Sequence, residues 1–254
     1  MTNQRHLRLA SPERVIEETK PSRQHSRVIW TAVILLVLIG VGAAVRRALF
    51  LVPILINGYV EPAPSPNPML AQFRALDDLF ARYPVLTLVH IISALMFLIL
   101  APVQFSRRFR ERHIKWHRRN GRLVLMCGMV VGLSALVMSL GMPAIGGVNQ
   151  AAATTLFALF FLFALGRAYR HIRRREITLH REWMIRAFSI GLAVATIRPI
   201  IGFFFATGRL TGLTPYEFFG TAFWMGFVLH LITAEIWIKW TKPKISVLPF
   251  RVLP

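Results

Sequence analysis

The chain has 254 residues, of which 55% are hydrophobic, with a mean hydropathy of +0.52 and a formal net charge of +20. A soluble domain of this size does not carry repeated helices that are apolar on every side, because a surface helix keeps one polar face. The composition therefore excludes an ordinary soluble protein. The basic residues lie between the apolar stretches, which indicates orientation in a membrane and no binding to nucleic acid.

Six apolar stretches run through the chain, each close to the roughly 20 residues that a helix needs to cross a bilayer core. They are Val28–Val45, Val85–Phe105, Leu123–Met142, Val148–Leu165, Ala187–Thr207 and Tyr216–Ile238. The sequence thus predicts an all-α membrane protein with six transmembrane helices. Four of these helices, the central ones, are expected to form the core.

The N-terminal part, residues 1–27, is polar and mixed in charge, which predicts a disordered tail. The first apolar stretch is as long as a membrane span and lacks a small-residue cleavage site, so it is predicted to be an uncleaved signal-anchor helix. Ala48–Val60 is too short to span, and it either continues the first helix or lies in the interface. Glu61–Pro68 is typical of an extended proline-rich turn, and the spacing within Leu70–Tyr83 predicts a short amphipathic helix.

Residues 28–84 would hold the first helix and an external connection, residues 85–238 a helical membrane core, and residues 239–254 a second cytoplasmic tail. The core contains two segments of similar sequence pattern that are offset by 63 residues. Val85 and Val148 begin two apolar stretches at this offset, and the pairs His117-Arg118 and His180-Arg181 follow them. Two parallel helical hairpins, each with a basic bend, are one interpretation, and similar loop composition alone is the other.

The basic residues are distributed asymmetrically between the two sides of the predicted bundle. Of the 31 Lys and Arg residues, 25 fall in the two tails and in the loops after the second and fourth spans. Five fall in the alternate connections, and Arg198 lies inside a span. The positive-inside rule therefore predicts six crossings with both termini in the cytoplasm, and a basic surface that meets anionic lipid head groups.

Two histidine–arginine motifs stand at the start of the third and fifth spans. The motif residues and their neighbours are Pro102, Gln104-Phe105, His117-Arg118-Arg119-Asn120-Gly121-Arg122, Gly146-Gly147, His180-Arg181-Glu182-Trp183-Met184-Ile185-Arg186 and Arg198. With these motifs, the chain from about Val85 to Ile238 resembles a family of bacterial membrane proteins, the domain of unknown function 2306, in whose pattern a glycine stands where this chain has Ala101. The resemblance implies a helical bundle in the bacterial inner membrane, and it implies no biochemical activity.

Paired histidines on facing membrane helices are how b-type cytochromes hold haem, since a neutral imidazole binds each axial position of the iron. His117 and His180 both stand at the cytoplasmic mouth, at matched positions, and are the candidate ligands of haem b or of a metal. Arg122 and Arg186 lie close by in the sequence and could meet the haem propionates. Contact with anionic head groups, and substrate or proton handling, are the alternative interpretations of the two histidines.

Two further histidines lie within the spans. At 1.5 Å per residue, His90 is roughly 8 Å and His230 roughly 21 Å below the outer surface, which fits poorly with one upright haem between them. Both remain candidate cofactor ligands. For His230, the sequence favours a hydrogen bond inside the bundle.

Arg198 is about eleven residues into the fifth span, roughly 17 Å from the cytoplasmic face, where an arginine costs about 2.5–3.5 kcal/mol on insertion scales. It is predicted to point into the bundle and to pair with the carbonyl that Pro199 frees, with Glu217, or with polar side chains of neighbouring helices. Glu235 has Lys239 four residues later, which favours an ion pair along one helix face. Gln104 and Trp183 are further candidates from the motifs.

The chain lacks a Gly-rich phosphate loop, a G-x-S-x-G elbow and an H-E-x-x-H motif. The absence of these motifs does not exclude an intramembrane enzyme, and the sequence therefore leaves open whether the protein is an enzyme. Its single cysteine, Cys127, can form neither an internal disulfide nor a metal cluster. Three classes of function remain open: a haem-binding protein of electron transfer or haem handling, a small transporter or proton-coupled channel centred on Arg198, and a non-catalytic scaffold or assembly factor.

Overall fold

The structure is a computed structural model that describes residues 14–17, 23–61, 74, 77–242 and 244–247. Its elements are β1 (Arg14–Glu17), α1 (Arg23–Asn57), α3 (Pro84–Gln104), α4 (Arg107–Arg112), α5 (Ile114–Gly141), α6 (Gly147–Arg173), α7 (Ile177–Thr211), α8 (Pro215–Thr241) and β2 (Lys244–Val247). Within the described residues, six helices are long and apolar enough to cross a membrane. This confirms the predicted all-α membrane fold.

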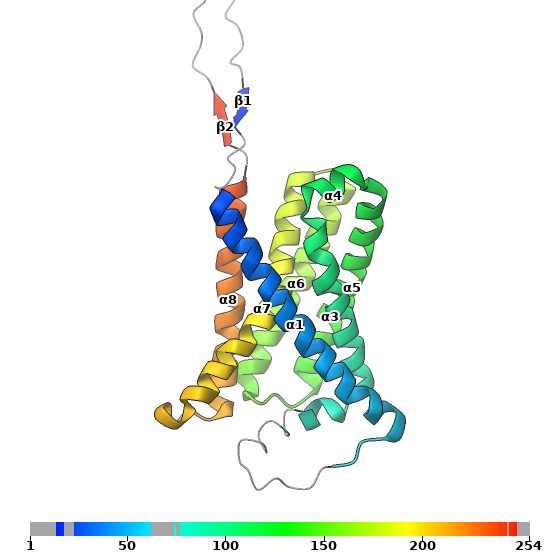
Figure 1. Cartoon of the computed structure of the whole chain (residues 1–254), viewed down its shortest axis with the longest axis vertical. Helices are drawn as coiled ribbons and strands as arrows, with labels where there is room; N and C mark the ends of the chain where they lie inside the picture. The colour runs from blue at the N-terminus through cyan, green and yellow to red at the C-terminus, as the bar shows by residue number, and fades with distance from the viewer. Residues whose placement is uncertain (1–13, 18–22, 62–73, 75–76, 243, 248–254) are drawn as a thin grey trace, which may run out of the picture.

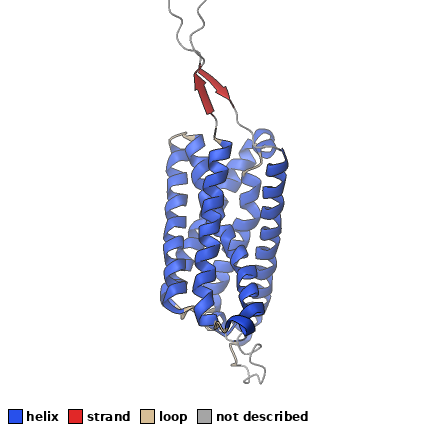
Figure 2. Cartoon of the chain, turned by 90° about the vertical axis from the view of Figure 1, so that its left-hand side faces the viewer, coloured by secondary structure: helices blue, strands red, loops and turns tan. Residues whose placement is uncertain are grey.

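The helices form an elongated bundle in which α3, α5, α6 and α7 alternate in direction (Figures 1 and 2). Helix α1 packs obliquely across α3 and α7, and α8 packs against α6 and α7. The core is rich in aromatic rings that fill the space between the helices. Phe97 and Phe161 meet edge to face with centroids 5.5 Å apart, and Phe188 lies 6.4 Å from Phe97. Such edge contacts add to the free energy gained by burying the rings.

Both described ends of the chain lie at the same end of the bundle. Strands β1 and β2 pair antiparallel beyond the start of α1 and the end of α8, with Arg14 opposite Val247 and Glu17 opposite Lys244 (Figure 1). Arg14–Glu17 is therefore a strand where the sequence predicted disorder. We call this end, at which α3, α6 and α8 finish and α5 and α7 begin, the basic end.

Helix α1 is longer than the apolar stretch that predicts it. It begins at Arg23 and ends at Asn57, so its 35 residues extend over about 52 Å. Ala48 and the residues after it therefore continue the first helix, which was one of the two predicted alternatives. The helix is tilted across the bundle (Figure 1), as a span longer than the hydrocarbon thickness requires. Of the predicted amphipathic helix, residues 77–81 are helical, and most of the rest lies outside the described residues.

The two hairpins α3–α5 and α6–α7 repeat the same design. Helices α3 and α6 begin at Pro84 and Gly147, and α5 and α7 begin at Ile114 and Ile177, 63 residues apart in each case. The hairpins also share packing positions. A Cβ placed on Gly128 would lie 3.2 Å from the Phe97 ring, and one on the equivalent Gly191 would lie 2.8 Å from the same ring. These matches favour the interpretation of two parallel hairpins.

Close packing between α5 and α6 depends on Gly132. A Cβ at this position would lie 2.5 Å from Leu162 Cδ2 and 3.1 Å from Phe161 Cδ1, so the Leu162 side chain or the helices must shift to accept one. We expect Gly132→Ala to lower the free energy of unfolding by about 1–3 kcal/mol, as overpacking does. Thermal unfolding in detergent would measure the change. Gly42→Ala on α1, where a Cβ meets nothing within 4 Å, is the matched control, and equal losses in both variants would contradict the prediction.

Candidate functional site

The motifs from α3 and α5 meet at the basic end. The Asn120 side chain donates a hydrogen bond from Nδ2 to the Leu100 carbonyl over 3.2 Å, which ties the first turns of α5 to the last turns of α3. One residue on, a Cβ on Gly121 would lie 3.4 Å from Gln104 Oε1, which is ordinary van der Waals contact. Gln104 of α3 therefore lies against the first motif on α5.

His117 on α5 and His180 on α7 lie close enough to interact electrostatically, and Arg110 on α4 is a further neighbour of His117. The His180 Nδ1 is 2.8 Å from the Ala168 carbonyl oxygen. Because a carbonyl only accepts, Nδ1 carries the proton and Nε2 of the neutral ring keeps its lone pair. His117 Nδ1 is buried and has no hydrogen-bond partner among the described residues.

A third histidine, which sequence reasoning missed, lies beside this pair. His171 is 6% exposed, its Nδ1 contacts the Glu176 carboxylate, and its Nε2 is buried with no partner in the described part of the chain. It interacts electrostatically with His180. The signal that could have found it is Glu176, which is the single acid in the basic loop between α6 and α7.

The hydrogen bond from His171 lowers the pKa of Glu176 below its ordinary value. A carboxylate with a lowered pKa stabilises the fold above its ordinary pKa, and this contribution is lost as the pH falls through the folded-state pKa. We therefore expect Glu176→Gln to lower Tm at neutral pH, with a difference from wild type that narrows on acidification. Tm measured in detergent across a pH series tests this. The exposed pair Arg107–Glu111 provides the control Glu111→Gln, for which we expect a small change at every pH.

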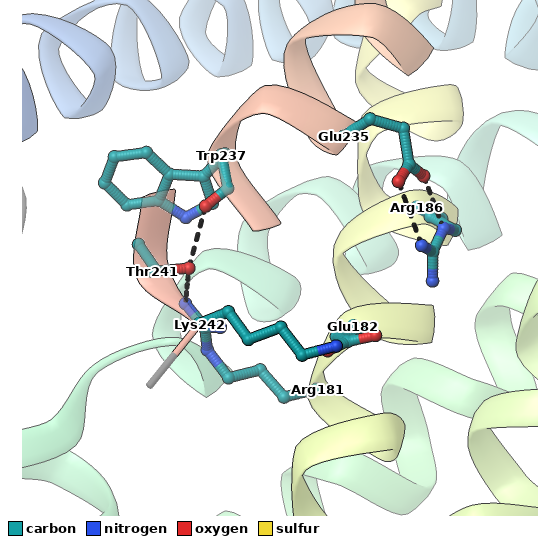
Figure 3. A network of polar contacts seen from close by, with 7 residues as sticks. All are labelled: Arg181, Glu182, Arg186, Glu235, Trp237, Thr241 and Lys242. Carbon is teal, nitrogen blue, oxygen red and sulfur yellow. Dashed lines mark hydrogen bonds and ion pairs between the residues drawn. The ribbon is translucent and has the colours of Figure 1, made fainter. Parts of the chain in front are cut away.

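An ion pair joins α7 to α8 further along α7 from the basic end than His180 (Figure 3). Arg186 donates from Nε to Glu235 Oε1 over 2.6 Å and from Nη2 to Oε2 over 3.0 Å, and its guanidinium lies 4.7 Å from the Trp183 ring centroid. The prediction that Glu235 pairs with Lys239 is wrong. The planar fork of an arginine on the facing helix binds both carboxylate oxygens, which a lysine on the same helix does not do.

Two more contacts fix the start of α7 to the end of α8 (Figure 3). Arg181 Nη2 donates to Thr241 Oγ1 over 3.0 Å, and that hydroxyl donates to the Trp237 carbonyl over 2.8 Å. Glu182, which is 7% exposed, lies 3.6 Å from Lys242 Nζ. With Arg186 held by Glu235, the polar residues of the second motif mainly position the helix that carries His180.

The two arginines predicted to meet haem propionates lie in different surroundings. Arg186 is engaged by Glu235, as described above. Arg122 is exposed, and its Nε lies 3.4 Å from the Arg118 carbonyl. Trp183 on α7 has a second cation near its ring, because the Arg167 guanidinium on α6 lies 5.5 Å from the ring centroid.

Buried nitrogens without a partner gather at the basic end. Within the described residues they are Gln104 Nε2, His117 Nδ1, Arg167 Nε and His171 Nε2, and one buried oxygen, Tyr59 Oη, lies elsewhere. Leaving such a group unsatisfied costs about 1–3 kcal/mol, so native proteins rarely keep several together without a purpose. This concentration singles out the basic end as the region with unused hydrogen-bonding capacity.

His90 and His230 are each bonded to a hydroxyl on a neighbouring helix. His90 Nδ1 lies 2.9 Å from Ser134 Oγ, and His230 Nε2 lies 2.7 Å from Thr196 Oγ1, as predicted for His230. The two histidines lie at different depths. At 1.5 Å per residue, His90 is about 9 Å from the first residue of α3, and His230 is about 22 Å from the first residue of α8. The described part of the chain holds no group of three or more His, Cys, Asp or Glu that could bind a metal.

The prediction for Arg198 is wrong. The residue is exposed on the side of α7, and among the described residues no acceptor forms a hydrogen bond with it. Glu217, the predicted partner, instead accepts from the Thr214 backbone N–H and hydroxyl at 2.7 and 2.8 Å and caps α8. The electrostatic neighbours of Arg198 are Arg46 and Arg47 on α1.

Comparison with known proteins agrees with the resemblance seen in the sequence. A family model described as "Predicted membrane protein (DUF2306)" matches residues 87–238, more than half of the chain. No curated protein and no solved structure matches the chain. The matched segment runs from the first turn of α3 to the last turn of α8 and contains both histidine–arginine motifs. The chain therefore belongs to the DUF2306 family of predicted membrane proteins.

Proposed function

We propose that this protein binds haem b at the basic end of the bundle, with His117 and His180 as the axial ligands, and serves electron transfer or haem handling in the membrane. What supports this most is that the two motif imidazoles occupy equivalent positions in the two hairpins and that His180 is an electrostatic neighbour of His117. A pair of imidazoles from facing helices is the ligand set of a b-type haem.

The hydrogen bonds of the two rings suit such ligation. Donation from His180 Nδ1 to the Ala168 carbonyl orients the ring and places the lone pair on Nε2, as outer-shell partners do for iron-binding histidines. His117 carries a buried nitrogen, Nδ1, with no hydrogen-bond partner in the part of the chain that the structure describes. Arg110 beside His117, and Arg167 with its unpartnered Nε, provide positive charge for the two propionates. When bound, haem would supply one-electron chemistry.

A titration tests the proposal. Ferric haem b added to the detergent-purified protein should bind saturably, with one haem per chain and the absorption spectrum of a six-coordinate, low-spin bis-imidazole complex. Binding that does not saturate, or a spectrum identical to that of haem in detergent micelles alone, would overturn the proposal.

The same proposal places the basic end in the cytoplasm of a bacterial cell, with the protein in the inner membrane. Both described chain ends and the two basic loops lie at this end of the bundle. An excess of arginine on one side is the pattern of cytoplasmic loops, which face anionic lipid head groups.

Reporter fusions provide the check on orientation. Fusions after Pro68 and after Gly146 should behave as periplasmic, and fusions after Arg112 and Arg174 as cytoplasmic, because six crossings with a cytoplasmic N-terminus would put the two pairs of sites on opposite sides. Alkaline phosphatase and green fluorescent protein report the two compartments. A cytoplasmic phenotype for the Pro68 fusion would contradict the six-crossing arrangement.

A further inference from the structure

Helix α1 crosses α7 at a close contact and then moves away from it. At the crossing, a Cβ on Gly40 would lie 3.5 Å from Ala195 Cβ and 3.0 Å from Leu98 Cδ1. Beyond this point, away from the basic end, the two helices diverge toward opposite sides of the bundle (Figure 1). Arg46 and Arg47 follow the crossing on α1, and Arg198 follows it on α7.

The three arginines lie at similar depth. The contacts of α1 with α3 place Arg46 opposite the region of Ile92, eight residues from the first residue of α3. This corresponds to about 12 Å from the end of the bundle opposite the basic end. A Cβ on Gly226 would lie 2.5 Å from Ile197 Cγ1, so Arg198 lies opposite the region of Met225, ten residues from the start of α8, or about 15 Å. An arginine side chain can reach the head-group region from this depth.

The cluster carries more positive charge than its protein partners neutralise. Asp77 is the carboxylate in contact with it: Arg47 pairs directly with this group, and Arg46 Nη2 lies 3.4 Å from its Oδ1. Arg47 also covers the Phe80 ring at 4.4 Å and is 14% exposed, whereas the Arg46 side chain is 62% exposed. Arg198 is exposed, without an acceptor among the described residues. Among the described residues, Asp77 thus pairs with two of the three guanidiniums, and Arg198 has no acid in contact with it.

We propose that Arg46, Arg47 and Arg198 bind the phosphate of a phospholipid from the leaflet opposite the basic end. A phosphate is the anion that arginine binds best through paired N–H donors, and it lies at the depth that these side chains can reach. The surface on the bilayer-centre side of the cluster is apolar and open. Val194, one turn before Arg198, is 43% exposed, and a Cβ on Gly42, one turn before Arg46, would meet nothing within 4 Å. The acyl chains would lie there, along α1 and α7.

Native mass spectrometry of the detergent-purified protein tests this inference, which is independent of haem binding. The probes are phosphatidylglycerol, diacylglycerol and inorganic phosphate, each titrated against wild type and the double variant Arg46→Gln/Arg198→Gln. We expect the variant to bind phosphatidylglycerol at least about tenfold more weakly, since each charge-assisted bond contributes about 1.5–3 kcal/mol. Arg82→Gln, an exposed arginine at the same end of the bundle, should bind like wild type.

Three outcomes would overturn the inference: equal phosphatidylglycerol binding by wild type and the double variant, equal binding of diacylglycerol and phosphatidylglycerol by wild type, or displacement of the lipid by an equal concentration of inorganic phosphate. The last outcome would assign the cluster to a free anion. Should the double variant fail to elute as a single folded species, Arg198→Lys replaces it. Lysine keeps the charge and loses the planar fork, so binding should weaken several-fold.

Discussion

Replacing Arg186 with leucine is expected to lower the free energy of unfolding by about 2–4 kcal/mol, because it removes two charge-assisted hydrogen bonds and a cation–π contact together. The Arg186 side chain is 17% exposed, and its guanidinium binds both oxygens of Glu235 and lies over the Trp183 ring. The substitution also leaves a carboxylate without its counter-charge between α7 and α8. Reversible unfolding in mixed detergent micelles would measure the loss.

Matched variants separate the ion pair from general damage to the helix. Glu235→Gln should cost less than Arg186→Leu, because Glu235 is 45% exposed and glutamine can still accept one hydrogen bond. A double-mutant cycle between the two positions isolates their coupling. Lys239→Gln should change stability by less than about 0.5 kcal/mol, as most surface substitutions do. A larger loss for Lys239→Gln than for Arg186→Leu would contradict the interhelical pair.

The second large effect concerns the proposed haem ligands. His117→Ala and His180→Ala should each weaken haem b binding at least about 100-fold, since the loss of even an outer-shell partner costs about 10–100-fold at a metal site. Each of these single variants keeps one of the two imidazoles and should also lose the low-spin spectrum. The reason is that a single histidine leaves one axial position of the iron without its protein ligand.

The bundle offers three matched controls for these variants. His90→Ala and His230→Ala remove imidazoles that bond to Ser134 and Thr196, so haem affinity should stay close to that of wild type. His171→Ala removes the neighbour of His180 and should change affinity much less than either ligand variant. Loss of haem binding in His230→Ala, with retention in His180→Ala, would move the site away from the basic end.

Much of the architecture could be predicted because the bilayer imposes it. Apolar length determines which segments span, and the offset between Val85 and Val148 reappears in the helix starts at Pro84 and Gly147. The helix ends could not be predicted in the same way. Apolar composition changes at the membrane surface, whereas backbone hydrogen bonds continue into polar sequence, so α1 extends from Arg23 to Asn57.

The partners of the charged residues could not be predicted, because they depend on how each helix is rotated about its axis. Glu235 could be matched with Lys239 by spacing alone, but only packing of α7 against α8 brings Arg186 to it. Arg198 was expected to point inward because charge is costly in lipid. Its position beside the divergence of α1 and α7 leaves it exposed next to Arg46, a relationship between segments that lie far apart in the sequence.

The most direct test of haem binding is the reduced-minus-oxidised absorption spectrum of protein purified from its own membrane without added haem. Our account predicts the sharp bands of a bis-imidazole b-type haem in wild type, unchanged bands in His230→Ala, and their absence in His117→Ala/His180→Ala at the same level of folded protein. A flat difference spectrum in wild-type protein from haem-sufficient cells, or bands that survive in the double variant, would contradict it.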